Sequence, residues 1–215
     1  MKKTFTLSTF AAAAVLMGAT SASAALIDFT DNSTPLSTSQ YTVIGDPVAP
    51  AADPGDTAPG PIVLSNGDVL AGENDGLGVK DDEISNPPPQ SITINFSSNK
   101  RLSAVYFLDL FSSPSGATEE EGRVNIGTER DASSFAFVEG TQPVDSGLPG
   151  LGELTGLNLI GKSFTIWVAR SNDATGTADG ALAGIDVAPV PLPASSLMLL
   201  AGLGGIAAMR RRKKA

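Results

Sequence analysis

Side-chain oxygen atoms are concentrated in one segment of this 215-residue sequence, GENDGLGVKDDEIS, which spans residues 72–85. The oxygen donors of the segment are Glu73, Asn74, Asp75, Asp81, Asp82 and Glu83, and Asp68 precedes it. Ca²⁺ takes about six to eight oxygen ligands, and glycines allow a loop to add its backbone carbonyls. The segment therefore predicts a calcium site formed by Asp75, Asp81, Asp82 and Glu83.

The spacing of these residues is equally typical of a solvated acidic loop. It does not match the start of an EF-hand loop, and the tandem repeats of other calcium turns are missing from the sequence. Gly76 and Gly78 do not begin a dinucleotide-binding motif, because Asp81 stands where the third glycine should be. Both interpretations of the segment stay open, with the solvated loop favoured.

The sequence contains neither histidine nor cysteine. Their absence excludes Ser-His-Asp and Cys-His nucleophiles, histidine-ligated zinc and disulfide bonds. A hydrolase would have to work with two carboxylates about 5–10 Å apart. Asp109 lies among apolar neighbours that indicate burial, a position more typical of a structural aspartate than of a catalytic one. We therefore predict a non-catalytic protein.

Trp167 and Tyr106 are the aromatic residues that could stack on sugar rings. Exposed aromatic faces are usual contacts for glycans, but aromatic residues make up 6% of the sequence and Trp167 fits a hydrophobic core equally well. A Ca²⁺-dependent glycan-binding module is therefore the alternative function to a non-catalytic surface protein.

Short strands separated by turns are predicted throughout residues 25–188. Ile92, Ile94 and Phe96 alternate with polar residues, a period that places one face of residues 91–98 on a core and the other in water. Residues 102–111 are apolar on both faces and belong in the middle of the fold. The predicted strands are residues 26–29, 41–44, 62–64, 68–70, 91–98, 102–111, 123–126, 134–138, 163–170 and 182–187.

Turn signals between these strands support an all-β fold, an antiparallel β-sandwich of jelly-roll type. Asn66-Gly67 is the strongest hairpin signal. Five prolines between Gly45 and Pro61 predict a loop, because proline cannot donate a hydrogen bond to a strand ladder.

Both ends of the chain have the composition of targeting segments. Residues 1–24 carry Lys2 and Lys3, an apolar stretch and Ala22-Ser23-Ala24, which predict a signal peptide and a mature chain from Ala25. Residues 187–209 contain no charge, and five basic residues follow at positions 210–214. This order predicts a transmembrane helix whose basic end stays in the cytoplasm.

Between these ends, residues 25–188 contain seven of the 14 basic residues and all 23 acidic residues, so this domain has a formal net charge of −16. Such a charge repels polyanions within a screening length of about 8–10 Å. It argues against nucleic acid, anionic lipid and polyanionic polysaccharide as partners of the domain, and leaves divalent cations and neutral or cationic glycans open.

Residues 189–215, PVPLPASSLMLLAGLGGIAAMRRRKKA, resemble the VPLPA variant of the PEP-CTERM sorting tail. The signature is Val190, Pro191, Leu192, Pro193 and Ala194, and the apolar run and basic end follow it in the family's order. The turn Asp75-Gly76-Leu77-Gly78-Val79 before Asp82-Glu83-Ile84 also looks like the front half of many domains that carry this tail. An ordinary C-terminal anchor is the alternative interpretation.

The resemblance implies recognition by an exosortase-type membrane protease. It further implies a transient stage in the inner membrane, removal of the tail near the signature, and display or release at the surface of a Gram-negative bacterium that makes exopolysaccharide. We therefore predict an exported surface or matrix protein associated with polysaccharide or biofilm.

Overall fold

The computed structural model of the protein describes residues 23–45, 48–50, 58–80, 83–86, 88–112, 119–130, 133–143, 147–170, 178–190 and 202. The predicted signal peptide, apart from Ser23 and Ala24, lies outside these residues. The signature after Val190 and the predicted transmembrane helix, apart from Gly202, also lie outside them. Among the residues that are described, no helix has the length and hydrophobicity needed to cross a membrane.

The described residues confirm an all-β fold. Its strands are β1 (Ala25–Asp28), β2 (Tyr41–Ile44), β3 (Val48–Pro50), β4 (Ile62–Val63), β5 (Val69–Leu70), β6 (Leu77–Val79), β7 (Ile92–Leu108), β8 (Phe111–Ser112), β9 (Glu120–Ile126), β10 (Ala136–Glu139), β11 (Gln142–Pro143), β12 (Gly152–Leu154), β13 (Leu159–Arg170) and β14 (Ala181–Pro189). The strands of the main sheet pair antiparallel, whereas the short β8 and β11 form a parallel pair. The jelly-roll arrangement stays a prediction.

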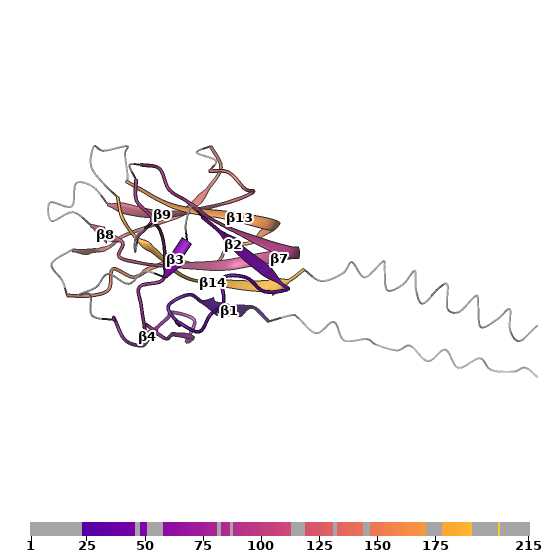
Figure 1. Ribbon diagram of the computed structural model, residues 1–215, viewed down its shortest axis with the longest axis horizontal. Helices are drawn as coiled ribbons and strands as arrows, with labels where there is room; N and C mark the ends of the chain where they lie inside the picture. The colour runs from indigo at the N-terminus through magenta and orange to yellow at the C-terminus, as the bar shows by residue number, and fades with distance from the viewer. Residues whose placement is uncertain are drawn as a thin grey trace, which may run out of the picture.

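Strand β7 organises the main sheet, which runs in the order β10-β9-β13-β7-β14-β6-β3 (Figure 1). Strand β2 pairs with the first half of β7, β13 pairs with β7 as far as Leu102, and β12 and β14 pair with the second half of β7. The central position predicted for residues 102–111 is therefore confirmed. Residues 91–98 and 102–111 are not separate strands, however, because the polar residues between them contain no proline or glycine and continue the same strand.

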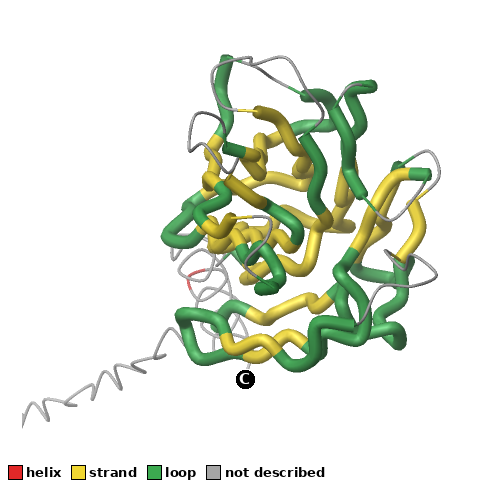
Figure 2. The backbone as a smooth tube through the Cα atoms, turned by 90° about the vertical axis from the view of Figure 1, so that its left-hand side faces the viewer, coloured by secondary structure: helices red, strands yellow, loops and turns green. Residues whose placement is uncertain are grey.

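Buried side chains cover both faces of the second half of β7. The larger hydrophobic cluster contains Val105 and Phe107 together with side chains from both halves of the sheet, such as Ile94 and Leu182. The smaller cluster contains Ala104, Tyr106 and Leu108. Figure 2 shows the strands in the interior of the body, with loops around them.

Leu102 and Leu110 lie in the larger cluster, although a regular two-residue alternation would place them on the face of Ala104, Tyr106 and Leu108. The pairing of β7 with β14 shifts by one residue between Leu102 and Ala104. Asp109 has a positive φ of 59°, which ends β7 before Leu110. Because a bulge or a left-handed residue breaks the two-residue alternation, each of these leucines turns to the opposite face.

Asn66-Gly67 forms the predicted hairpin between β4 and β5, with Ile62 opposite Leu70. The amide of Leu64 donates to the carbonyl of Asp68, and Gly67 has a φ of 90°, the geometry of a three-residue loop that ends in a left-handed glycine. Two predicted loops contain strands instead. Strand β3 lies within the proline-rich segment, and β6 lies within the acidic segment.

These two strands pair with each other, so β3 forms an edge of the main sheet. An edge strand tolerates Pro50 because one side of its backbone needs no ladder partner. The proline-based prediction failed for this reason.

Candidate functional site

The acidic segment is anchored to the loop after β1. Thr30 is fully buried, and its hydroxyl donates a hydrogen bond of 2.6 Å to Asp28 and accepts one of 2.8 Å from the amide of Gly72. The second carboxylate oxygen of Asp28 accepts from the amide of Ala71 at 2.7 Å. These bonds fix the start of the acidic segment to β1.

Asn74 continues this attachment, although the sequence suggested it as a calcium ligand. Its side chain is 4% exposed. The side-chain amide donates to the carbonyl of Thr30 and to Oδ1 of Asn32, and its oxygen accepts from the amide of Gly76 at 2.7 Å. Asn74 therefore holds two loops together, a structural role that its residue type does not reveal.

The predicted calcium ligands are distributed around β6. Asp75 precedes this strand, and Glu83 follows it at the end of a turn in which the amide of Val79 donates to the carbonyl of Glu83 at 2.8 Å. Asp81 and Asp82 belong to this turn in the sequence but lie outside the described residues. Within the part of the chain that is described, no three acidic side chains are grouped as metal ligands. The calcium site stays a prediction.

Trp167 and Tyr106 do not form an exposed sugar-stacking platform. Trp167 is 2% exposed and Tyr106 is fully buried. The Tyr106 ring packs in the smaller hydrophobic cluster, and its hydroxyl donates a hydrogen bond of 2.7 Å to Oδ2 of Asp186. The platform was predicted from aromatic residue type, which does not distinguish an exposed ring from a core ring.

Around the Tyr106 hydroxyl the structure assembles a polar group that the sequence did not predict. The side-chain amide of Asn66 in the β4–β5 loop lies 3.2 Å from this hydroxyl, 3.1 Å from Asp186 and 2.8 Å from Asp68. Burial and then the hydrogen bond to Asp186 raise the pKa of Tyr106 far above its usual value. The hydroxyl therefore stays protonated and acts as a donor to the buried carboxylate.

A second polar group lies on β9 and β13, beneath the chain that follows β9. Thr165 and Trp167 are buried because the chain after β9 folds over them. The Thr165 hydroxyl donates to the carbonyl of Gly127, and the Trp167 ring packs against Phe135 with a centroid distance of 5.8 Å. Both faces of β13 are therefore buried from Phe164 to Ala169.

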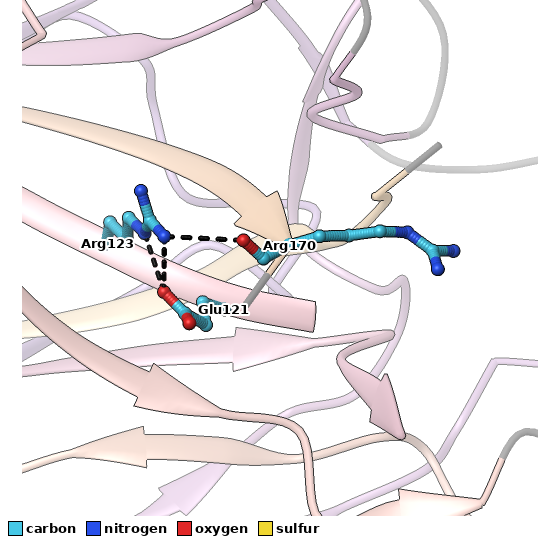
Figure 3. A network of polar contacts seen from close by, with 3 residues as sticks. All are labelled: Glu121, Arg123 and Arg170. Atoms are coloured by element: carbon cyan, nitrogen blue, oxygen red, sulfur yellow. Dashed lines mark hydrogen bonds and ion pairs between the residues drawn. The ribbon is translucent and has the colours of Figure 1, made fainter. Parts of the chain in front are cut away.

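Arg123 is the centre of this second group (Figure 3). Its guanidinium forms an ion pair of 2.6 Å with Glu121, donates to the carbonyl of Arg170 at 3.4 Å and lies 4.5 Å from the centre of the Phe135 ring. The Arg170 side chain points away from Arg123 in Figure 3. Arg123 thus contributes an ion pair and a cation–π contact to one side of the sheet.

A hollow of about 490 Å³ lies at the end of β9 and is lined by residues 125–130. Asn125 is 4% exposed, and among the described residues neither its Oδ1 atom nor the buried Nη1 atom of Arg130 has a hydrogen-bond partner. Burial, followed by the charge of Arg123, lowers the pKa of Arg130. One acceptor and one donor at this hollow suit water or a hydroxyl group.

The predicted sorting signature begins where the sheet ends. Strand β14 continues to Pro189, which pairs with Lys100 of β7, and Val190 is the next residue. Ala25, the first residue of β1, pairs with Val187. Figure 1 shows β1 and β14 side by side. Both predicted targeting segments are therefore attached at the same end of the domain.

Residues 189–213 match the PEP-CTERM protein-sorting motif. The segment therefore carries a PEP-CTERM protein-sorting motif. The motif starts at Pro189, the position at which the resemblance also began. In the structure Pro189 is the last residue of β14. No curated protein and no solved structure matches the chain. The family assignment therefore concerns the PEP-CTERM motif and not the β-domain before it.

The PEP-CTERM motif implies that the protein is exported to the cell surface and recognised by an exosortase. Val190 lies between Pro189 and the rest of the predicted signature, Pro191, Leu192, Pro193 and Ala194, which lie outside the described residues. The VPLPA variant of the PEP-CTERM motif stays a prediction.

Proposed function

We propose that the protein is a non-catalytic component of the cell surface or extracellular matrix that an exosortase-type protease processes, and that it works with exopolysaccharide or in biofilm. The PEP-CTERM motif at residues 189–213 carries this proposal. The tail is the VPLPA variant, and its apolar run crosses the inner membrane before cleavage. The domain of residues 25–188 is an antiparallel sandwich around the larger hydrophobic cluster.

The positions of the strand ends support removal of both targeting segments. A signal peptide of residues 1–24 ends directly before β1, and the signature follows directly after β14. Cleavage after Ala24 and within the signature removes no residue that pairs in the sheet. The exported domain therefore keeps its fold after both cuts.

A comparison of cells with and without an exosortase tests this proposal. With the protease, the protein at the surface should lack its basic end; without it, the uncleaved form should stay in the membrane fraction. Pro191→Ala/Pro193→Ala should block processing, whereas Pro149→Ala, outside the motif, should leave it unchanged. Equal cleavage in cells that lack the protease would reject exosortase processing.

A Ca²⁺-dependent glycan-binding domain is the second candidate function. The turn from Val79 to Glu83 supports it, because Glu83 closes this turn through its carbonyl and Asp81 and Asp82 lie between its ends in the sequence. Ligands that bind the folded state raise its melting temperature.

We expect millimolar Ca²⁺ to raise the melting temperature of the protein, and Asp81→Asn/Asp82→Asn to abolish this shift. The control Asp68→Asn, on the β4–β5 hairpin, should keep it. An unchanged melting temperature in the parent protein would remove the calcium site.

A further inference from the structure

We infer that the end of the domain from which the PEP-CTERM tail leaves docks onto anionic phospholipid headgroups. This surface, here named the basic end, consists of Lys100, Arg101, Ile160 and Lys162 with the neighbouring ends of β1 and β14. The inference adds a membrane contact of the folded domain itself to the proposed function and rests on that function only for the identity of the membrane.

Strand pairing places these residues beside both attachment points. Lys100 pairs with Pro189, and Arg101 pairs with Ala188 on one side and Ile160 on the other. Lys162 follows Gly161, which also pairs with Lys100. Lys100, Ala25 and Pro189 line one hollow of about 490 Å³. The basic end is therefore where the chain enters and leaves the domain.

The chemistry of the basic end suits an anionic surface. Arg101 and Lys162 are exposed, Lys100 is half-buried, and Ile160 is 41% exposed. None of the described residues 38–45, 92–102, 156–165 and 187–190 is Asp or Glu; the nearby loop after β9, in which the amide of Gly127 donates to Ser163, contains Glu129 followed by Arg130. Asp186 lies close by in the chain but is 6% exposed and accepts from Tyr106. Three cations beside an apolar side chain match phosphate headgroups above an acyl region.

Carboxylates gather at the opposite end of the domain. Glu120 accepts from the amides of Phe111 and Asp179, and Glu121 lies opposite Glu139 where β9 and β10 pair. Glu119 also lies at this end, close to Glu139. Its hydrogen bond to Glu139 and then its negative charge raise the pKa of Glu139. The domain is therefore polarised along β14, from acidic at the start of this strand to basic at its end.

This polarity explains how a domain with a net charge of −16 can approach an anionic membrane. Strand β14 has nine residues, or about 26 Å between its ends at roughly 3.3 Å per residue. Charges separated by more than about 8–10 Å are largely screened at physiological ionic strength. The far carboxylates therefore weaken docking little and orient the domain with its basic end toward the lipid.

A fluorescence-quenching experiment on the full chain tests the inference. The chain has no cysteine, so Ser98→Cys, an exposed position in β7 next to the basic end, accepts a single fluorophore. Thr141→Cys, exposed after β10, is the matched position at the acidic end. The protein is bound to vesicles of phosphatidylcholine or phosphatidylglycerol that contain a headgroup quencher.

We expect stronger quenching at Ser98 in phosphatidylglycerol than in phosphatidylcholine, and no such difference at Thr141. Arg101→Gln/Lys162→Gln should reduce the ratio of docked to undocked protein about 25-fold, since each basic residue near an anionic surface accounts for roughly a fivefold change. Ser134→Glu/Thr141→Glu changes the net charge equally but should reduce the ratio far less.

Equal quenching at Ser98 in the two lipids would overturn the inference, as would equal losses in the two double variants. Raised salt should also decrease the quenching in phosphatidylglycerol, and a salt-independent signal would contradict electrostatic docking. Because the experiment contains no protease, its failure would leave the processing of the PEP-CTERM tail unaffected.

Discussion

The hydrogen bond from Tyr106 to Asp186 joins a core aromatic ring to a carboxylate that is 6% exposed. The Oδ2 atom of Asp186 has two donors, Tyr106 and Asn66, whereas its buried Oδ1 atom has no hydrogen-bond partner within the part of the chain that is described. A buried charge depends strongly on the donors that it retains. Loss of the Tyr106 hydroxyl should therefore lower the free energy of unfolding more than loss of a hydroxyl that bonds to a solvent-exposed carboxylate.

Tyr106→Phe should lower the free energy of unfolding by about 1–3 kcal/mol, because it removes a hydrogen bond to a charged group and leaves that group buried. The matched control is Tyr41→Phe, which removes a hydrogen bond to the neutral carbonyl of Pro35 and should cost about 0.5–1.5 kcal/mol. Chemical denaturation measures both values. A smaller loss for Tyr106→Phe than for the control would contradict this role of Asp186.

Glu120 makes the stability depend on pH at the acidic end. Burial raises its pKa above the ordinary 4.5, despite hydrogen bonds from Phe111 and Asp179 that lower it. The folded protein therefore binds more protons at this site than the unfolded chain, and stability falls as pH rises from 4.5 through the folded pKa. Glu120→Gln should flatten this part of the curve of unfolding free energy against pH. An unchanged slope would refute the assignment.

At the scale of elements, Gly76 sets the close approach of the acidic segment to β14. It has a φ of 121°, and an added Cβ would lie 2.4 Å from the carbonyl oxygen of Leu182. Gly67 in the hairpin loop also has a positive φ, of 90°, but an added Cβ there would meet no atom within 4 Å. A side chain at Gly67 would therefore cause backbone strain alone, whereas a side chain at Gly76 would cause backbone strain and a steric clash.

Gly67→Ala should cost about 1–2 kcal/mol from backbone strain, whereas Gly76→Ala should cost more than about 3 kcal/mol because the backbone of β14 must also move. The denaturation midpoints of the two variants measure these losses, provided that the unfolding free energy of both depends equally steeply on denaturant concentration. Similar losses would show that the segment before β6 adjusts without disturbing β14.

Most of the main strands were predictable because their apolar residues recur regularly. The predicted residues 41–44 coincide with β2, and the predicted residues 163–170 and 182–187 lie within β13 and β14. The short β3 and β6 were missed because each forms through pairing with a distant segment, in spite of local proline and glycine. Pairing partners far apart in the sequence leave no signal in a local pattern.

The polar groups were less predictable than the strands. The oxygen-rich side chains of the acidic segment indicated metal ligands. The side-chain amide of Asn74, however, donates hydrogen bonds to Thr30 and Asn32. Thr165 is a polar residue that is fully buried, because the chain after β9 covers it and accepts a hydrogen bond from its hydroxyl. Residue type specifies what a side chain can bind, whereas its actual partner depends on how loops fold over the sheet.

At the scale of the whole molecule, the two predicted targeting segments adjoin neighbouring strands. Ala25 and Val187 are paired, and the PEP-CTERM motif begins two residues after Val187. The pairing of β14 with β7 extends to Pro189, so no linker separates the sheet from the motif. In the proposed function, exosortase cleavage takes place directly beside the folded domain, and a cut before Pro189 would remove residues from β14.

The intact mass of the protein recovered from the cell surface tests the central claim most directly. The predicted mass corresponds to a chain that begins at Ala25, retains β14 to Pro189 and ends within the signature of residues 190–194. A surface protein that starts at Met1 or retains the basic residues 210–214 would contradict the account.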